Sequence, residues 1–529
     1  MECRRARWQF LKAAPAAALA AYSAGGQAGW ELAPAESLAA DKPAACPGDL
    51  RMTTTKPSLA RDTDEIYAQR LNRYVTAMRN GTPDCIPIRP FAAEFTARYA
   101  GYTCQEVTHD YRKAFDAVLK CAADFDWDAV VPNMIYVWTG MTQAIGLHYY
   151  AIPGIDIEPD IGFQYREPPE ARSFMRREEY DELIEDPTRF LYEVWLPRVS
   201  TEVSPPGACT SYRNNLSFVK GGMAMLSYFT AFGPQIERLR TETGTVSAIS
   251  GILKSPLDIL ADKLRGYIGL AFDLMEVPER VLAACWALMP HLAHVAISGL
   301  DPERNLPIPI WMHRGCVPFI SHAHFNTIYW PTLKPIVEAI WARGNQVLFY
   351  AEGNWDAHLN SFAELPAGSI VYHVDRGDIA KVHKAIGHKF CLSGGIPNAL
   401  LASGTPEQVR KCCKQVIDEA AEGGGYIMDA SAIIQNDATV ENIRALTDFT
   451  REYGVYGPCG SCTAPLTAPA PTPCEPAFPI RKVKPGVCIP WEEKLRELPD
   501  ITGDKDLPKG IWEEVDAFAY LYIWHLLLG

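Results

Sequence analysis

The sequence has no uninterrupted apolar run of the roughly 20 residues that a membrane-spanning helix needs, so we expect no membrane span. It also has no excess of positive charge, because 50 Lys and Arg residues stand against 63 Asp and Glu residues, a net charge of -13. A nucleic-acid-binding surface needs clustered basic side chains, so we expect no nucleic-acid partner. No Gly-x-Gly-x-x-Gly loop follows an expected strand, which removes the main reason to expect a dinucleotide-binding fold.

The composition is that of a globular protein, with 48% hydrophobic and 21% charged residues. Fifteen cysteines are scattered through the long chain, whereas disulfide frameworks are typical of small secreted domains, so we expect a cytoplasmic protein. Residues 1–58 are predicted to be a leader, either disordered or export-like. Arg4, Arg5 and Arg7 precede an alanine-rich run, which leaves twin-arginine-type export as the alternative.

Short apolar runs alternate with segments of helical period between Pro307 and Tyr453. This alternation predicts βα units with parallel strands, in either an open doubly wound sheet or a closed barrel. The predicted strands are Cys85–Ile88, Ala129–Val131, Ile308–Met312, Val347–Ala351, Ile370–Tyr372, Phe390–Leu392 and Tyr426–Met428. The predicted helices are Leu257–Phe272, Pro278–Ala293, Tyr329–Arg343, Asp378–Ile386, Val409–Ala421 and Val440–Tyr453.

The chain after this region changes in composition. Residues 59–456 form the predicted α/β domain, and residues 457–529 a Pro-rich extension that ends in a docking helix at Phe518–Leu528. Its cysteines begin with a Cys-x-x-Cys pair but lack the second pair typical of a zinc ribbon, so a metal site and a loose tail both stay open. These cysteines are Cys459, Cys462, Cys474 and Cys488.

Polar side chains follow three successive predicted strands. Because the carboxyl ends of parallel strands meet at one edge, we expect these side chains to surround one cavity. Crowded ionisable groups shift each other's pKa, as acid–base catalysis requires, although a ring of salt bridges that holds loops is the alternative. The candidates are His313, Arg314, Glu352, Asn354, Asp356, His373, Asp375, Arg376 and Asp378.

Glu352 is the first candidate among them, because it comes directly after an apolar strand and precedes Gly353. It is expected to act as a catalytic base, together with His373 and Asp375. A His, Asp and Glu set also suits a divalent ion such as zinc, so the same three residues are the candidate metal ligands.

The segments HRG, FYAEGNWD, HVDRGD and SGTPEQV, in this order, resemble the uroporphyrinogen decarboxylase superfamily. The resemblance extends from about Tyr67 to Tyr456 and implies a (β/α)8 TIM-type barrel, here with an N-terminal leader and a Pro-rich C-terminal extension. The superfamily includes porphyrinogen decarboxylases and methyltransferases that serve corrinoid proteins. Because active sites of such barrels lie at the strand ends, His313, Arg314, Asn354 and Asp378 are expected to bind substrate.

Two departures from the superfamily's patterns bear on the reaction. Porphyrinogen decarboxylases carry two arginines after the first strand and an aspartate after the next, whereas this chain has only Arg89 and then Pro132-Asn133. The zinc methyltransferases carry cysteine ligands at places that resemble Tyr350-Ala351-Glu352 and Asp429-Ala430-Ser431 here. Arg89 and Asp429 are therefore expected to contact substrate, although the chain lacks the complete set of characteristic residues of either branch.

The resemblance favours a methyltransferase-like enzyme that carries out corrinoid-linked methyl transfer or demethylation. Its partners would be a small-molecule or tetrapyrrole-related ligand, a corrinoid as co-substrate and a corrinoid protein. One alternative is a uroporphyrinogen decarboxylase that acts in porphyrin biosynthesis. The other is a non-catalytic protein that binds a tetrapyrrole or corrinoid.

Overall fold

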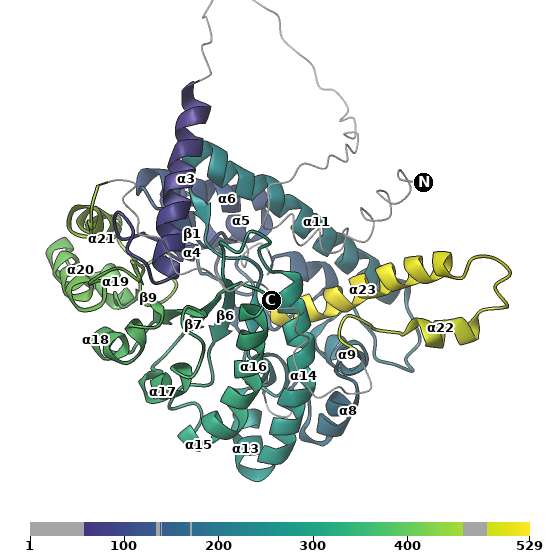
Figure 1. Cartoon of the computed structure of the whole chain (residues 1–529). Coiled ribbons are helices and arrows are strands. Elements are labelled where there is room, and N and C mark those ends of the chain that lie inside the picture. Colours follow the sequence, from purple (N-terminus) through teal and green to yellow (C-terminus); the bar gives the residue numbers. More distant parts are fainter. Residues whose placement is uncertain (1–57, 134–137, 139, 170–171, 459–483) are drawn as a thin grey trace, which may run out of the picture.

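The fold is built on a parallel β-sheet, seen in a computed structural model that describes residues 58–133, 138, 140–169, 172–458 and 484–529 (Figure 1). The main sheet has six strands in the order β10-β9-β8-β7-β6-β5, and each neighbouring pair is parallel. Its strands are β5 (Leu253–Lys254), β6 (Ile308–Met312), β7 (Val347–Ala351), β8 (Ile370–Val374), β9 (Cys391–Gly394) and β10 (Tyr426–Ile427). The α/β class with a parallel sheet is thus confirmed.

The central strands form where the sequence is apolar without interruption. All five residues of each of β6, β7 and β8 are buried, because helices cover parallel strands on their outer face. Figure 1 shows helices that cover the sheet in this way, namely α14, α16, α17 and α18.

The helices that follow these strands begin where the sequence carries capping residues. Thr405 accepts a hydrogen bond from the Gln408 N–H, and Pro406 occupies the first turn of α20. The helices of residues 253–458 are α12 (Pro256–Ile259), α13 (Tyr267–Glu276), α14 (Pro278–Ser298), α15 (His322–His324), α16 (Trp330–Trp341), α17 (Leu359–Phe362), α18 (Ile379–Val382), α19 (Asn398–Ser403), α20 (Pro406–Ala420) and α21 (Val440–Tyr453).

The N-terminal half is mostly helical in the described residues and contributes only short strands. These are β1 (Ala129–Val130), β2 (Tyr150–Ala151), β3 (Gln164–Tyr165) and β4 (Val246–Ser247). The helices are α3 (Ser58–Met78), α4 (Ala93–Ala100), α5 (Cys104–His109), α6 (Tyr111–Asp124), α8 (Tyr180–Glu185), α9 (Pro187–Phe190), α10 (Leu196–Val199) and α11 (Tyr212–Thr243).

The expected strand at Cys85–Ile88 is not a continuous strand, but its backbone bonds to the residue after β10 on one side and to the residue before β1 on the other. The Met428 N–H donates to the Pro87 carbonyl at 2.9 Å, and the Asp128 N–H donates to the Ile88 carbonyl at 3.0 Å. β1 in turn pairs with β4 in parallel. The closed (β/α)8 barrel stays a prediction, because the named strands form separate sheets.

The C-terminal extension packs into the body of the molecule. After α22 (Trp491–Glu497), helix α23 (Asp506–Leu528) runs from the periphery to the centre, where the last residue lies in Figure 1. Its residues 520–528 are buried, as expected for a docking helix. The leader up to residue 57 and Cys459, Cys462 and Cys474 lie outside the described residues.

One helix of the described residues, α14, is long and apolar enough to cross a membrane. However, 61% of its most apolar window is buried inside the molecule, and core helices of folded proteins meet the same criterion.

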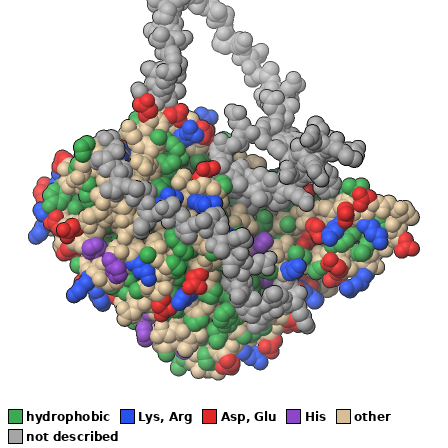
Figure 2. Space-filling view, in the orientation of Figure 1, with side chains coloured by type: hydrophobic (Ala, Val, Ile, Leu, Met, Phe, Trp, Pro, Cys, Tyr) green, Lys and Arg blue, Asp and Glu red, His purple; other side chains and the backbone are tan. Residues whose placement is uncertain are grey.

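Acidic and basic side chains are interspersed over the face shown in Figure 2.

Candidate functional site

A cavity of about 470 Å³ lies at the carboxyl ends of the central strands. Lys254 ends β5, and His313 and Arg314 follow β6, while the residues after β7 and β8 complete this side of the cavity. Active sites of parallel α/β proteins occupy this edge. The lining residues are Trp138, Tyr150, Phe163, Tyr165, Tyr228, Phe229, Ile249, Gly251, Ile252, Lys254, Asp262, Trp311, His313, Arg314, Phe319, Glu352, Gly353, Asp375, Arg376, Ile433, His525, Leu528 and Gly529.

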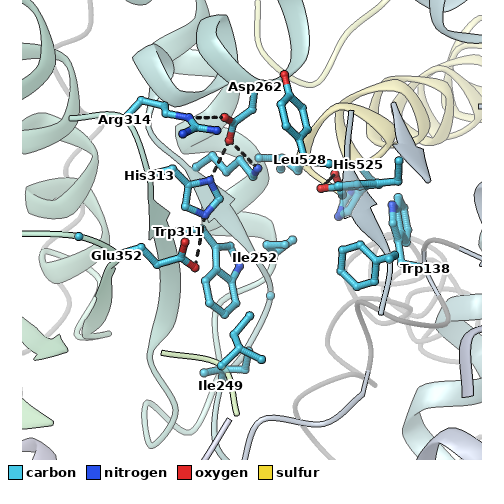
Figure 3. Close-up of a pocket in the computed structure, with 18 of the residues that line it drawn as sticks. Trp138, Ile249, Ile252, Asp262, Trp311, His313, Arg314, Glu352, His525 and Leu528 are labelled. Atoms are coloured by element: carbon cyan, nitrogen blue, oxygen red, sulfur yellow. Dashed lines mark hydrogen bonds and ion pairs between the residues drawn. The ribbon is translucent and has the colours of Figure 1, made fainter. Parts of the chain in front are cut away.

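Asp262 is the centre of a charged cluster on one wall (Figure 3). Its carboxylate accepts hydrogen bonds from Lys254 Nζ at 3.0 Å, His313 Nδ1 at 2.8 Å and Arg314 Nε at 3.2 Å. On the other side of the imidazole, His313 Nε2 lies 3.7 Å from Glu352 Oε1. Asp262, His313 and Glu352 therefore form a linear array from the interior to the cavity.

The neighbouring Asp258 fixes the backbone that carries this array. Ser255 caps α12, and Asp258 in the first turn accepts hydrogen bonds from the backbone N–H groups of His313 and Arg314 at 3.3 and 2.7 Å. The Tyr329 hydroxyl donates to its other oxygen at 3.0 Å. Asp258 is thus a positioning residue for the loop after β6.

The charges of the cluster shift the pKa values of its members. Burial opposes ionisation of Asp262, but Lys254 and His313 hold its pKa well below the ordinary value. Burial also opposes protonation of His313, yet the Glu352 and Asp262 carboxylates raise its pKa above the ordinary value. His313 therefore holds a proton up to higher pH than a free histidine, as a general acid near neutral pH requires.

Asp375 also lies in the cavity wall, as expected. Its carboxylate accepts a hydrogen bond from the Gly353 N–H at 2.7 Å, and burial raises its pKa. Asn354 and Asp378, by contrast, do not line the cavity, and each accepts hydrogen bonds from nearby backbone N–H groups. Asn354 accepts from the Asp356 N–H, and Asp378 caps α18.

The remaining predicted site residues lie in a buried cluster outside the cavity wall. His373 is inaccessible to solvent, and its ring nitrogens bond to Ser393 Oγ at 3.0 Å and to the Ser431 carbonyl at 2.9 Å. Arg89 and Asp429 pair at 3.2 Å, and both side chains are fully buried. The structure thus separates these three residues from the predicted residues that line the cavity.

The donor set that was expected to bind zinc is not assembled. Within the described part of the chain, no group of three or more His, Cys, Asp or Glu residues is arranged to hold a metal ion. Glu352 and Asp375 face the cavity, whereas both nitrogens of His373 are engaged elsewhere. The residues do not fit a zinc ion, so we derive no step through a metal bound by them.

The wall opposite the charged cluster is aromatic and was missed from the sequence. It includes Trp138, Tyr228 and Phe229, together with His525 and Leu528 from the end of α23. These residues are far apart along the chain, so no local pattern joins them. Lys254 and Asp262 were also missed, although the strand end Leu253-Lys254 followed by the capping pair Ser255-Pro256 is a usable signal.

Comparison with known proteins assigns part of the chain to a family. Residues 235–453 match the family model "Uroporphyrinogen decarboxylase (URO-D)", which agrees over this segment with the resemblance seen in the sequence. Asp262, His313, Glu352 and Asp375 all lie within it. A search of curated proteins finds no match. Among solved structures, a methyltransferase from Methanosarcina mazei aligns with 72% of this chain and 98% of its own, with 14% identity and a TM-score of 0.48.

Proposed function

We propose that this protein is a demethylating methyltransferase of the uroporphyrinogen decarboxylase superfamily. It would transfer the methyl group of a small donor to a corrinoid co-substrate carried by a partner protein. The observation that carries the proposal is the Asp262, His313 and Glu352 array at the edge of a mostly apolar cavity. Such an array supplies a proton to a leaving group in a site that excludes much of the water.

The proposed step gives His313 the role of general acid. A reduced corrinoid, with cobalt in the +1 state, supplies the nucleophile that accepts the methyl group. As the bond between the methyl carbon and its heteroatom breaks, the electron pair stays on the heteroatom, which takes the proton from His313 Nε2. Asp262 at Nδ1 stabilises the charged imidazole before transfer, and Glu352, whose side chain is 37% exposed, relays a proton from solvent afterwards.

We propose further that the strands close into a (β/α)8 barrel. The segment 86–90 bonds to Met428 on one side and to residues 128–131 on the other. β1 pairs with β4, and the segment that contains β4 continues into β5, which pairs with β6. Counted in this way, the segment 86–90, β1, the β4–β5 segment and β6 to β10 supply the eight positions of a barrel.

The residues that line the cavity favour porphyrinogen decarboxylation less than methyl transfer. Arg89, the one arginine near the place where the decarboxylases bind substrate carboxylates, is fully buried and pairs with Asp429. It is not among the residues that line the cavity. A substrate with several carboxylates would therefore need other cationic partners.

The corrinoid visible spectrum tests the proposed function. Purified protein is mixed with reduced corrinoid and a panel of methyl donors, and methyl transfer is followed as the spectral change of the corrinoid. We expect His313→Gln to slow transfer by about 100-fold or more, the usual contribution of a general acid, and the exposed His388→Gln to have no effect. No transfer from any donor would refute the proposal. Partly decarboxylated products from uroporphyrinogen would support the decarboxylase instead, and tight corrinoid binding without turnover would support the carrier.

A further inference from the structure

We propose that the cavity binds a neutral aryl methyl ether as its methyl donor, an inference that rests on the proposed function. The observations that carry it are the aromatic wall of the cavity and the pairing of the charged groups beside it. The transferred methyl group would leave an aryl oxygen, which becomes a phenol when it takes the proton of His313.

Aromatic rings line much of the cavity and contact one another in edge-to-face pairs. Trp138 packs on Tyr228 with ring centroids 4.9 Å apart and an interplanar angle of 79°. Tyr150 packs on Phe163 at 5.1 Å and 72°. A flat arene gains stacking and edge contacts from such rings in addition to the burial of its apolar surface.

The side chains that α23 contributes to the wall carry no formal charge near neutral pH. Burial lowers the pKa of His525 to about 4, and its Nδ1 lies 2.7 Å from the Leu521 carbonyl. Leu528 is apolar and buried. Gly529, which follows the helix, also lines the cavity, and its oxygen already accepts a hydrogen bond from Lys263 Nζ. This part of the wall therefore offers a charged substrate no free counter-ion.

Most charged groups on the facing wall already have partners of opposite sign. Asp375 and Arg376 also line this wall, and the Arg376 charge acts to lower the pKa of Asp375. Lys254 and Arg314 both bond to Asp262, and Glu352 faces His313. The Arg314 guanidinium is also placed 5.0 Å from the ring centroid of Phe319, which restricts its movement. A charged ligand would have to lose its hydration and displace one of these pairs, a cost that a neutral ligand does not meet.

The two walls fix the direction in which an aryl ether would lie. In Figure 3, His313 and Glu352 lie next to Trp311, while Trp138, His525 and Leu528 face them across the cavity. The ether oxygen would point to His313 Nε2, and the ring would extend toward Trp138. The ring therefore serves recognition, and the array serves proton transfer.

Binding of three probes of similar size to the full chain tests this inference, by titration calorimetry without corrinoid. The probes are 4-methylanisole, which is neutral, 4-methoxybenzoate, which is an anion, and 4-methoxyphenyltrimethylammonium, which is a cation. We expect the neutral probe to bind about tenfold or more tightly than either ion, because the ions lose hydration without gaining a free partner. Equal or tighter binding of either ion would overturn the inference.

Two substitutions on α11 locate the binding. Phe229 is half-buried in the cavity wall, and Met223 on the same helix is 67% exposed away from it. Phe229→Ala is expected to weaken binding of 4-methylanisole by about tenfold, the upper part of the range for one aromatic contact, and Met223→Ala to leave it unchanged. An equal effect of both would place the probe elsewhere and overturn the inference.

The failure of this inference is distinguishable from that of the proposed function. If methanol methylates the corrinoid while no arene binds, methyl transfer stands and the aryl substrate class falls. If 4-methylanisole binds with the expected selectivity but no donor methylates the corrinoid, the binding class stands and the methyl-transfer proposal falls.

Discussion

Single side chains decide the proposed chemistry, and His313 leads to the first prediction. Because the protonated imidazole is the active form, the transfer rate should fall as pH rises through its pKa, which Glu352 and Asp262 raise above the ordinary value. Glu352→Gln removes the largest interaction that raises this pKa and should move the fall to lower pH. The pH profile of single-turnover methyl transfer, recorded for the unaltered protein and for Glu352→Gln, measures the fall in rate and its displacement. The exposed Glu303→Gln is the control, and an unchanged profile in Glu352→Gln would contradict the assignment.

The buried pair of Arg89 and Asp429 leads to a prediction about stability. Burial raises the pKa of Asp429 to about 7, so at pH 8 the carboxylate is mostly ionised and pairs with Arg89. Asp429→Leu leaves a buried, uncompensated guanidinium and should lower the free energy of unfolding by about 3–5 kcal/mol. Denaturant titration at pH 8 measures this loss.

The double variant Arg89→Met with Asp429→Leu is the control for that prediction. Replacing both partners by apolar residues of similar size removes the unpaired charge, so most of the lost stability should return. Additive losses in the double variant would mean that the two residues stabilise the fold independently.

Strand ends could be placed from the sequence to within two residues, which was enough to indicate most of the charged cavity residues. His313, Arg314, Glu352 and Asp375 line the cavity because they follow their strands directly. His373 does not, because β8 continues to Val374 and places His373 inside the strand, where its side chain is buried. An error of two residues in one strand end therefore moved a predicted catalytic residue out of the site.

Among the secondary-structure elements, long apolar runs were predictable and two-residue strands were not. β6 and β7 match their predicted bounds, and α21 matches at both ends, because periodicity and capping agree there. β4 and β5 lie in a segment for which no strand was predicted. Strands this short carry no period of their own, and pairing with distant neighbours defines them.

Adjacent glycines on α11 lead to a prediction about how α23 docks. A Cβ atom on Gly221 would lie 2.2 Å from the Tyr522 hydroxyl oxygen and 2.7 Å from Ile145 Cγ2, whereas one on Gly222 would have nothing within 4 Å. Gly221→Ala should therefore lower the free energy of unfolding by about 1–3 kcal/mol, the usual cost of overpacking.

Gly222→Ala is the matched control, because it makes the same change to the helix without the contact. It should raise stability by about 0.5–1 kcal/mol, since alanine favours a helix over glycine. Thermal unfolding of both variants measures the difference, and equal shifts would mean that α11 and α23 are not in close contact at Gly221.

At the scale of the whole molecule, the site joins the segment that matches the family model to segments outside it. Residues 235–453 supply the charged cluster, and Trp138, Tyr228 and α23 supply much of the facing wall. The sequence could indicate the first part, because strand ends share an edge. It could not indicate the second, because only the folded chain brings residues as distant as Trp138 and His525 together, with ring centroids 6.5 Å apart.

Closure of the barrel is the last prediction, and amide hydrogen exchange tests it. If the segment 86–90 is a barrel strand, the N–H groups of Arg89, Asp128 and Met428, which donate to backbone carbonyls of neighbouring strands, should be protected as strongly as those of β7. The N–H of Gly207, in an exposed turn, should exchange quickly and sets the unprotected limit. An open sheet would instead give its marginal strands weaker protection than its centre, because edge strands open more readily. Protection of Met428 without protection of Asp128 would then place the opening between the segment 86–90 and β1.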